Sequence, residues 1–223
     1  MLLLVTDTSG KHGFVALARA GENPRANEVN VIEEVSLVGG TFSAQLVPQI
    51  SALLAKHSVR KTDIGAFIVV SGPGSFTGLR VGLAAIKALA EILHKPIVPL
   101  SLLEVVAVAS QRSGRVLAVL DAGRGEVYAG EYEVAGAHAQ FLGERMLRKD
   151  LPPATERQTV VTSDKALAES WPPGRSVLVP VIATAVAQLG WRKLQTGETV
   201  TPEQLEANYI RRSDAEILAS PRG

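Results

Sequence analysis

The chain has 223 residues, of which 46% are hydrophobic and 20% are charged, and 23 Lys and Arg residues nearly balance 22 Asp and Glu residues. Such a composition is typical of a folded protein with a large core, and its near-neutral charge argues against a standalone nucleic-acid binder, which usually carries a basic excess. The lack of cysteine excludes disulfides, thiolate chemistry and cysteine-ligated zinc, and it is compatible with the cytoplasmic location that we expect. We expect neither a signal peptide, because the apolar start has no basic flank, nor a membrane span, because the longest apolar stretch (96–109) is too short.

The first hundred residues predict the element order β-β-β-α-β-α-β. Runs that are apolar throughout or alternate in polarity predict strands at 2–6, 14–19, 29–37, 66–70 and 97–100. Apolar residues at helical spacing predict helices at 42–57 and 79–93. Pro48 has to lie in the first turns of the earlier helix or kink it.

The strand that ends at Asp7, with its polar turn and returning strand, recurs 114 residues later around Asp121. Repetition of one supersecondary unit predicts an α/β fold with two related lobes, 1–100 and 101–223, although an Asp-ended hairpin can also occur twice by chance. In the second lobe we expect strands at 140–147, 159–162 and 176–179 and a helix at 181–194, with connections at 151–154 and 172–174. Residues 197–223 are interpreted as a loosely attached tail, anchored by Tyr209 and Ile210.

The two Asp-ended hairpins and the glycine loop at 72–78 are candidates for contact with a phosphate or nucleotide. Turn amides and a helix N-terminus favour an anion, and the carboxylates can hold a metal or orient water. The residues with this predicted role are Asp7, Thr8, Gly74, Ser75 and Asp121. Plain turn capping by the aspartates, and N-capping by Ser75 or Thr77, explain the same residues. The loop is not a P-loop, because no Gly-Lys-Ser/Thr follows it.

Catalytic machinery is not recognisable in the sequence. The four histidines (His12, His57, His94 and His138) include no pair at the spacing of a helical zinc site, and no Gly-x-Ser-x-Gly nucleophile elbow is present. We therefore predict no catalytic residue and no metal site in this chain.

The helix after the glycine loop has a stripe of small residues, formed by Gly78, Gly82 and Ala85. Such a stripe lets another element approach closely, and that element is either the protein's own sheet or a partner. If the stripe and part of the 42–57 helix are exposed together, they form an apolar patch typical of a protein interface.

Several of these segments together resemble the TsaB (YeaZ) family. They are the loop and helix start Gly72-Pro73-Gly74-Ser75-Phe76-Thr77-Gly78-Leu79-Arg80-Val81-Gly82, the early Asp7-Thr8-Ser9, the later Asp121-Ala122 with Gly125-Glu126-Val127-Tyr128, and the closing Tyr209-Ile210-Arg211. The resemblance extends over nearly the whole chain. It implies a two-lobed actin-like, sugar-kinase-like fold, in agreement with the repeated hairpin.

The resemblance also implies a function, that of a non-catalytic subunit that pairs with a TsaD homologue, with the ATPase TsaE, in making threonylcarbamoyladenosine in tRNA. It implies no cofactor for this chain itself, leaves open whether ATP or ADP binds at the joint between subunits, and implies that tRNA is held chiefly by the complex. An isolated chain is expected to form a homodimer that covers its apolar patch. The implied partner interface comprises Phe42, Leu46, Ile50, Thr77, Gly78, Arg80, Gly82, Leu83 and Ile86.

Two positions depart from the family pattern. Phe42 stands where many relatives have His, and Gly123 stands where Arg is common. The alternative functions are an autonomous nucleotide-dependent ATPase or phosphotransferase that uses Asp7, Asp121 and the glycine loop, and, ranked last, a protease.

Overall fold

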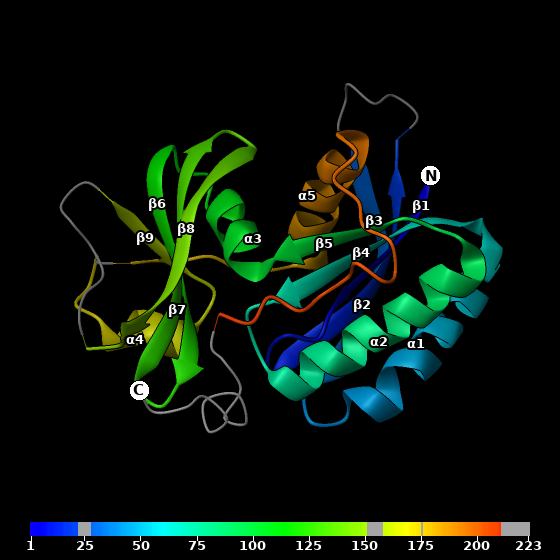
Figure 1. Ribbon diagram of the computed structural model, residues 1–223, viewed down its shortest axis with the longest axis horizontal. Coiled ribbons are helices and arrows are strands. Elements are labelled where there is room, and N and C mark those ends of the chain that lie inside the picture. The colour runs from blue at the N-terminus through cyan, green and yellow to red at the C-terminus, as the bar shows by residue number, and fades with distance from the viewer. Residues whose placement is uncertain (22–27, 151–157, 175, 211–223) are drawn as a thin grey trace, which may run out of the picture.

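The computed structural model describes residues 1–21, 28–150, 158–174 and 176–210, and it contains two five-stranded mixed sheets (Figure 1). The first sheet has the order β3-β2-β1-β4-β5 and the second has the order β10-β9-β6-β7-β8. The strands of the first sheet are β1 (Leu2–Asp7), β2 (His12–Ala20), β3 (Val29–Val38), β4 (Ile64–Gly72) and β5 (Ile97–Ser101). Those of the second are β6 (Gly114–Gly123), β7 (Glu126–Ala135), β8 (His138–Arg148), β9 (Thr159–Thr162) and β10 (Val177–Leu178).

The two sheets have the same topology. In each, a first strand pairs antiparallel with the second and parallel with the fourth, as β1 does with β2 and β4, and as β6 does with β7 and β9. Asp7 and Asp121 lie in the corresponding strands β1 and β6. The duplicated two-lobed α/β fold that the repeat predicts is therefore confirmed.

Helices cover both faces of the first sheet. On one face lie α1 (Phe42–Lys56) and α2 (Phe76–Leu93), which pack side by side (Figure 1). On the other face lies α5 (Ala183–Gln195), together with α3 (Leu102–Ala109), which also contacts the second sheet. The side chains of β1 point alternately to the two faces of the sheet, and both faces are covered. Leu4 packs toward α1 and α2, whereas Leu3 and Val5 pack toward α5.

The second sheet also divides its core between two faces. Val116, Ala118 and Leu120 of β6 share a core with the first lobe, whereas Leu117 and Val119 pack toward α4 (Lys165–Ser170) and Trp171. The helices α3 and α5 consequently lie in the region between the two sheets (Figure 1).

The structure differs from the sequence prediction in three helices. The sequence pattern predicts no helix at α3 or α4. In α3 the reason is that sheets flank the helix on two sides, so it is apolar over most of its length and shows no amphipathic period. The helix expected from residue 79 begins at Phe76, because the Ser75 side chain caps it by accepting from the Gly78 amide at 3.3 Å. The predicted boundary at residue 100 also differs from the packing, since α5 follows it in sequence yet covers the first sheet.

Residues 199–210, here called the strap, run across the first lobe toward the start of α2 (Figure 1). Val200 pairs with Ile97 at the edge of the first sheet, Leu205 is buried against the α1 and α2 side, and the Asn208 amide donates to the Ser71 carbonyl at 2.8 Å. The Tyr209 ring stacks on Phe76 at 4.7 Å between ring centroids, in agreement with an anchoring role for Tyr209. The predicted connection at 151–154 and the tail beyond residue 210 lie outside the described residues.

Candidate functional site

The turn after β1 is closed by the Asp7 side chain. Its Oδ1 accepts hydrogen bonds from the Ser9 amide at 2.8 Å and the Ser9 hydroxyl at 2.6 Å. The carboxyl group is buried, and this burial raises the pKa of Asp7 above its ordinary value despite the two donors from Ser9. The capping interpretation of Asp7 therefore has a direct structural basis.

The glycine loop packs closely against that turn. The Ser75 amide donates to the Ser9 carbonyl at 2.7 Å, and the Thr8 hydroxyl donates to the Gly78 carbonyl at 2.8 Å. A Cβ added at Gly74 would overlap the Ser9 carbonyl, and one at Gly78 would overlap the Thr8 carbonyl. The loop glycines thus allow two backbone segments of the same chain to meet, and the Ser75 and Gly78 amides have partners within the chain.

Asp121, the counterpart of Asp7 in the second lobe, is more accessible. Its Oδ1 accepts from the Gly123 amide at 2.9 Å, and its Oδ2 lies 3.6 Å from the Lys149 ammonium group. Both aspartates therefore close the turns that follow their strands. A phosphate role for Asp7, Thr8, Gly74, Ser75 and Asp121 stays a prediction.

Most residues of the predicted partner interface are buried within the chain. Five of them, Phe42, Leu46, Ile50, Leu83 and Ile86, form part of the core between the helices and the first sheet. Gly78 and Gly82 face Thr8, so the stripe of small residues serves an internal contact. Thr77 and Arg80 are exposed. A partner interface on α1 and α2 would therefore have to use the outer side of these helices, because the inner side is buried against the first sheet.

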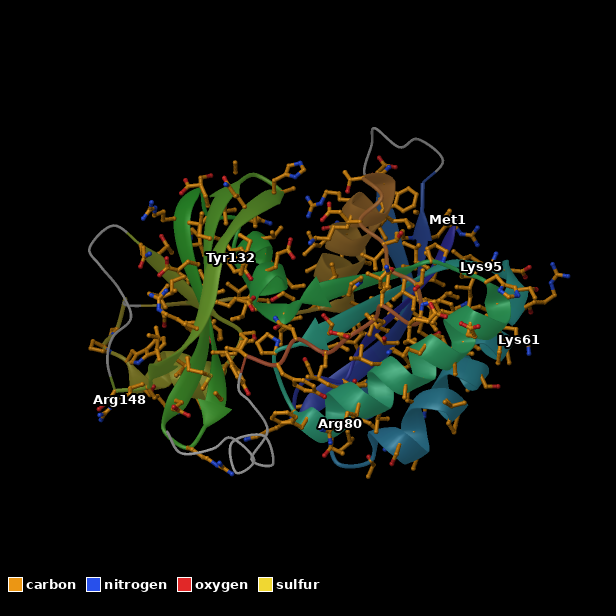
Figure 2. All side chains as sticks on the ribbon, in the orientation of Figure 1. Met1, Lys61, Arg80, Lys95, Tyr132 and Arg148 are labelled. Carbon is orange, nitrogen blue, oxygen red and sulfur yellow. The ribbon has the colours of Figure 1, made fainter. Side chains whose placement is uncertain are left out.

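The outer side of α1 and α2 carries mainly small and apolar residues, with two charged ones. We call it the outer helical face and define it by the exposed residues Ala44, Val47, Pro48, Ser51 and Ala52 of α1 and Thr77, Arg80, Ala84, Ala88, Glu91 and Ile92 of α2. Val47 is 56% exposed and Ile92 is 67% exposed. Arg80 lies in the first turns of α2 (Figure 2), where its guanidinium is 5.8 Å from the Phe76 ring centroid. The face is suited to close contact with another helical surface.

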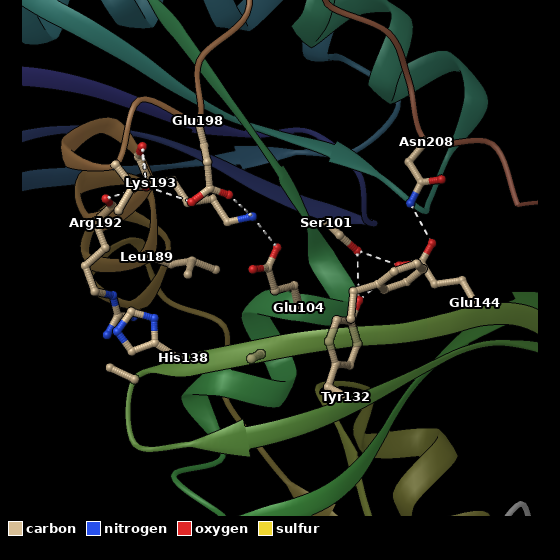
Figure 3. A pocket seen from close by; sticks show the side chains of 14 residues that line it. Ser101, Glu104, Tyr132, His138, Glu144, Leu189, Arg192, Lys193, Glu198 and Asn208 are labelled. Atoms are coloured by element: carbon tan, nitrogen blue, oxygen red, sulfur yellow. Dashed lines mark hydrogen bonds and ion pairs between the residues drawn. The ribbon is translucent and has the colours of Figure 1, made fainter.

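A polar pocket between the lobes was missed by the sequence analysis (Figure 3). Its best-connected group is the Glu144 carboxylate, which accepts from the Ser101 and Tyr132 hydroxyls, each at 3.0 Å, and from the Asn208 amide nitrogen at 2.8 Å. Burial, together with the nearby Glu144 carboxylate, raises the pKa of Tyr132, which keeps this hydroxyl a donor. These partners come from β8, β5, β7 and the strap, so no local motif could reveal the pocket.

The described residues contain no group of three or more His, Cys, Asp or Glu side chains that could hold a metal ion. Nor does any helix in the described part of the chain have the length and apolarity needed to cross a membrane.

Comparison with known sequences gives one family model and several relatives. Residues 36–149 match the family described as "TsaD: tRNA N6-adenosine threonylcarbamoyltransferase". A Bacillus subtilis protein, "tRNA threonylcarbamoyladenosine biosynthesis protein TsaB", is 31% identical over 134 residues, which cover 60% of this chain and 56% of that protein. The Escherichia coli protein of the same name is 32% identical over 60% of this chain and 55% of its own length. The chain thus matches little more than half the length of these two relatives. An uncharacterized Mycobacterium tuberculosis protein is 31% identical over 90% of this chain and 89% of its own.

Solved structures show the same similarity. "YeaZ from Pseudomonas aeruginosa" superposes with a TM-score of 0.72 at 25% identity, covering 93% of this chain and all of that one. A second structure, of a protein described as similar to the peptidase YeaZ from Pseudomonas aeruginosa, has a TM-score of 0.73 at 27% identity and covers 94% of this chain and 99% of its own. The likeness extends over both lobes.

Proposed function

Because the chain belongs to the TsaB (YeaZ) family, we propose that it acts in the biosynthesis of threonylcarbamoyladenosine in tRNA, as a non-catalytic subunit that pairs with a TsaD homologue. In this proposal the TsaD homologue carries out the transfer, TsaE joins the assembly, and tRNA is held by the complex in the cytoplasm. ATP or ADP, where it takes part, binds at the joint between subunits.

The observation that carries this proposal is the outer helical face. The apolar side chains of Val47 and Ile92 are exposed there, and two exposed alanines on each helix belong to the same face, although the chain has a large core in which apolar residues could be buried. Small residues on two adjacent helices let the helices of a partner approach closely, and removing the apolar atoms from water drives association. In the isolated chain the same face is free to pair with a second copy.

A non-catalytic role is supported by the engagement of the candidate phosphate groups. Asp7 is buried and bonded to Ser9, and the Ser75 amide is bonded to the Ser9 carbonyl. A phosphate bound there would have to displace these contacts, whereas a phosphate-binding loop usually presents its amides to the ligand.

Pairing is tested by substitutions on the outer helical face. Val47→Asp and Ala88→Arg each place a charge on this face without entering the core, and both are expected to abolish co-purification with the TsaD homologue. The matched control is Ala166→Arg, at an exposed position of α4 in the second lobe, which is expected to pair normally. Normal pairing of both Val47→Asp and Ala88→Arg would refute the interface.

The role itself is tested by reconstituting tRNA threonylcarbamoylation from purified components with and without this chain. We expect little product without the chain, and little with Val47→Asp. Threonylcarbamoyl transfer by the isolated chain would contradict the non-catalytic role. ATP hydrolysis by the isolated chain that is lost in Asp7→Asn would instead support the enzymatic alternative.

A further inference from the structure

The pocket between the lobes has the size and lining of a small-molecule site. Its volume is about 580 Å³, within the range common for such sites. Its walls come from the end of β5, from α3, β7 and β8, from α5 with the residues just after it, and from the strap, and so from both halves of the chain (Figure 3). The proposed partner role makes no use of this pocket.

Most charged groups in the pocket already have partners. The Lys193 ammonium lies 2.9 Å from the Glu104 carboxylate and 3.5 Å from that of Glu198. Burial raises the pKa of Glu104, and Lys193 opposes this shift. Glu144 has its three donors from Ser101, Tyr132 and Asn208. These groups fix the walls of the pocket and leave little capacity for a ligand.

Arg192 is the exception among them. Its Nε is buried and has no hydrogen-bond partner among the residues that the structure describes. Desolvation lowers the pKa of Arg192, and the Glu104 charge partly offsets this effect. Arg192 and His138 both line the pocket, and Figure 3 shows them on the side opposite Glu144. The Nε itself is closed to a ligand, and a carboxylate in the pocket would instead meet the terminal nitrogens of the guanidinium group, whose charge is partly desolvated.

The rest of the lining selects among anions. The carboxylates of Glu104, Glu144 and Glu198 outnumber the cations Arg192 and Lys193, so the lining repels a dianion such as phosphate more strongly than an anion with a single charge. A monovalent carboxylate matches the fork of the guanidinium group. Leu189 and Phe141 add apolar surface that suits an organic body. We propose that the inter-lobe pocket binds a small organic carboxylate, whose carboxylate group pairs with Arg192 and whose apolar part packs against Leu189 and Phe141.

The test measures binding to the isolated full-length chain by NMR, following the Nε–H resonance of Arg192. The probes are isovalerate, L-valine, isovaleramide and inorganic phosphate. We expect saturable shifts with isovalerate or L-valine, and at least about tenfold weaker binding of isovaleramide and phosphate, since each lacks one of the required features. A preference for L-valine over isovalerate would identify the ligand class as amino acids, and the reverse would identify simple acids. Binding of phosphate or isovaleramide as tight as that of both carboxylates, or no binding of either carboxylate, would overturn the proposal.

Five variants in two sets separate the site from general effects on folding. Arg192→Gln is expected to weaken carboxylate binding at least about tenfold and Arg192→Lys to weaken it less, whereas Arg112→Gln, at an exposed position outside the pocket, leaves it unchanged. Ala137→Trp, at the exposed edge of the pocket, is expected to block binding sterically, and Ala135→Trp, an exposed residue of the same hairpin outside the lining, is its control. The probe Nε–H is absent from Arg192→Gln and Arg192→Lys, so binding to these variants is followed at the backbone amide of Lys193. Unchanged binding in both Arg192→Gln and Ala137→Trp would refute the site.

Discussion

The Thr8 hydroxyl donates to the Gly78 carbonyl at 2.8 Å and thereby ties the turn after β1 to the first turn of α2. The same threonine lies against two glycines of the helix. A Cβ at Gly78 would overlap the Thr8 carbonyl, and one at Gly82 would overlap the Thr8 hydroxyl. The stripe of small residues on α2 and the turn after β1 therefore pack directly against each other inside the first lobe.

Gly78→Ala and Gly82→Ala are expected to lower the free energy of unfolding by about 1–3 kcal/mol each, although alanine favours a helix over glycine. The effect is measured by urea denaturation. The two clashes differ in kind, because one involves a backbone carbonyl and the other a side chain. Thr8→Ala should therefore relieve much of the Gly82→Ala penalty and little of the Gly78→Ala penalty. Equal rescue of both variants would contradict this packing.

Asp7→Asn tests the effect of the buried carboxyl group on stability. Burial raises the pKa of Asp7 in the folded state above its ordinary value of 3.8. The folded state therefore holds the proton more tightly than the unfolded state does, and the resulting stability is fully present below pH 3.8 and is lost as the pH rises through the folded pKa. An asparagine keeps an oxygen acceptor for Ser9 and has no charge to bury. We expect the stability of Asp7→Asn to decrease less between pH 3 and pH 7 than that of the unsubstituted protein, as measured by thermal unfolding. The same pH dependence in both proteins would contradict a raised pKa of Asp7.

Glu144 links the strap to both lobes, because its carboxylate accepts from Asn208 of the strap, Ser101 of β5 and Tyr132 of β7. Glu144→Ala removes the acceptor of the Ser101, Tyr132 and Asn208 side chains and should lower the free energy of unfolding by about 1–3 kcal/mol. The Asn208 amide, which donates to Ser71, should then exchange faster with solvent in a hydrogen-exchange experiment. Glu133→Ala, an exposed glutamate of β7, is the control and should change neither quantity.

Glu34 caps a helix that lies far away in sequence. Its Oε2 accepts from the Ala183 amide at 3.1 Å, at the start of α5, and a negative charge there also complements the helix dipole. Glu34→Ala should destabilise the protein by about 1 kcal/mol, Glu34→Gln should cost less, and Ser36→Ala at an exposed position of the same strand should be neutral. The melting temperatures of the three variants are measured by thermal unfolding. A melting temperature of Glu34→Ala equal to that of the unsubstituted protein would contradict the capping role of Glu34.

The sequence predicts much of this fold because most of its strands carry local signals. Hairpins at Asp7 and Asp121 can be recognised from apolar runs that end in polar turns, and their repetition predicts two lobes. The helix α3 could not be recognised in the same way, because a segment flanked by sheets on two sides has no polar face to mark its period.

The candidate sites depend on contacts that are remote in sequence. A stripe such as Gly78 and Gly82 indicates that something approaches closely, and only the packing of Thr8 shows that the neighbour is internal. The pocket around Arg192 combines residues from 101 to 208, and none of them belongs to a motif that spacing could reveal.

The position of α5 has a consequence for how the protein is made. This helix is among the last elements of the chain, yet it covers one face of the sheet that the first residues form. During synthesis the first sheet emerges from the ribosome long before α5 does. One apolar face of the sheet therefore stays exposed until α5, which ends at residue 195, has also been made. A gene fragment that encodes only residues 1–100 should therefore yield an aggregating product rather than an independent half-molecule.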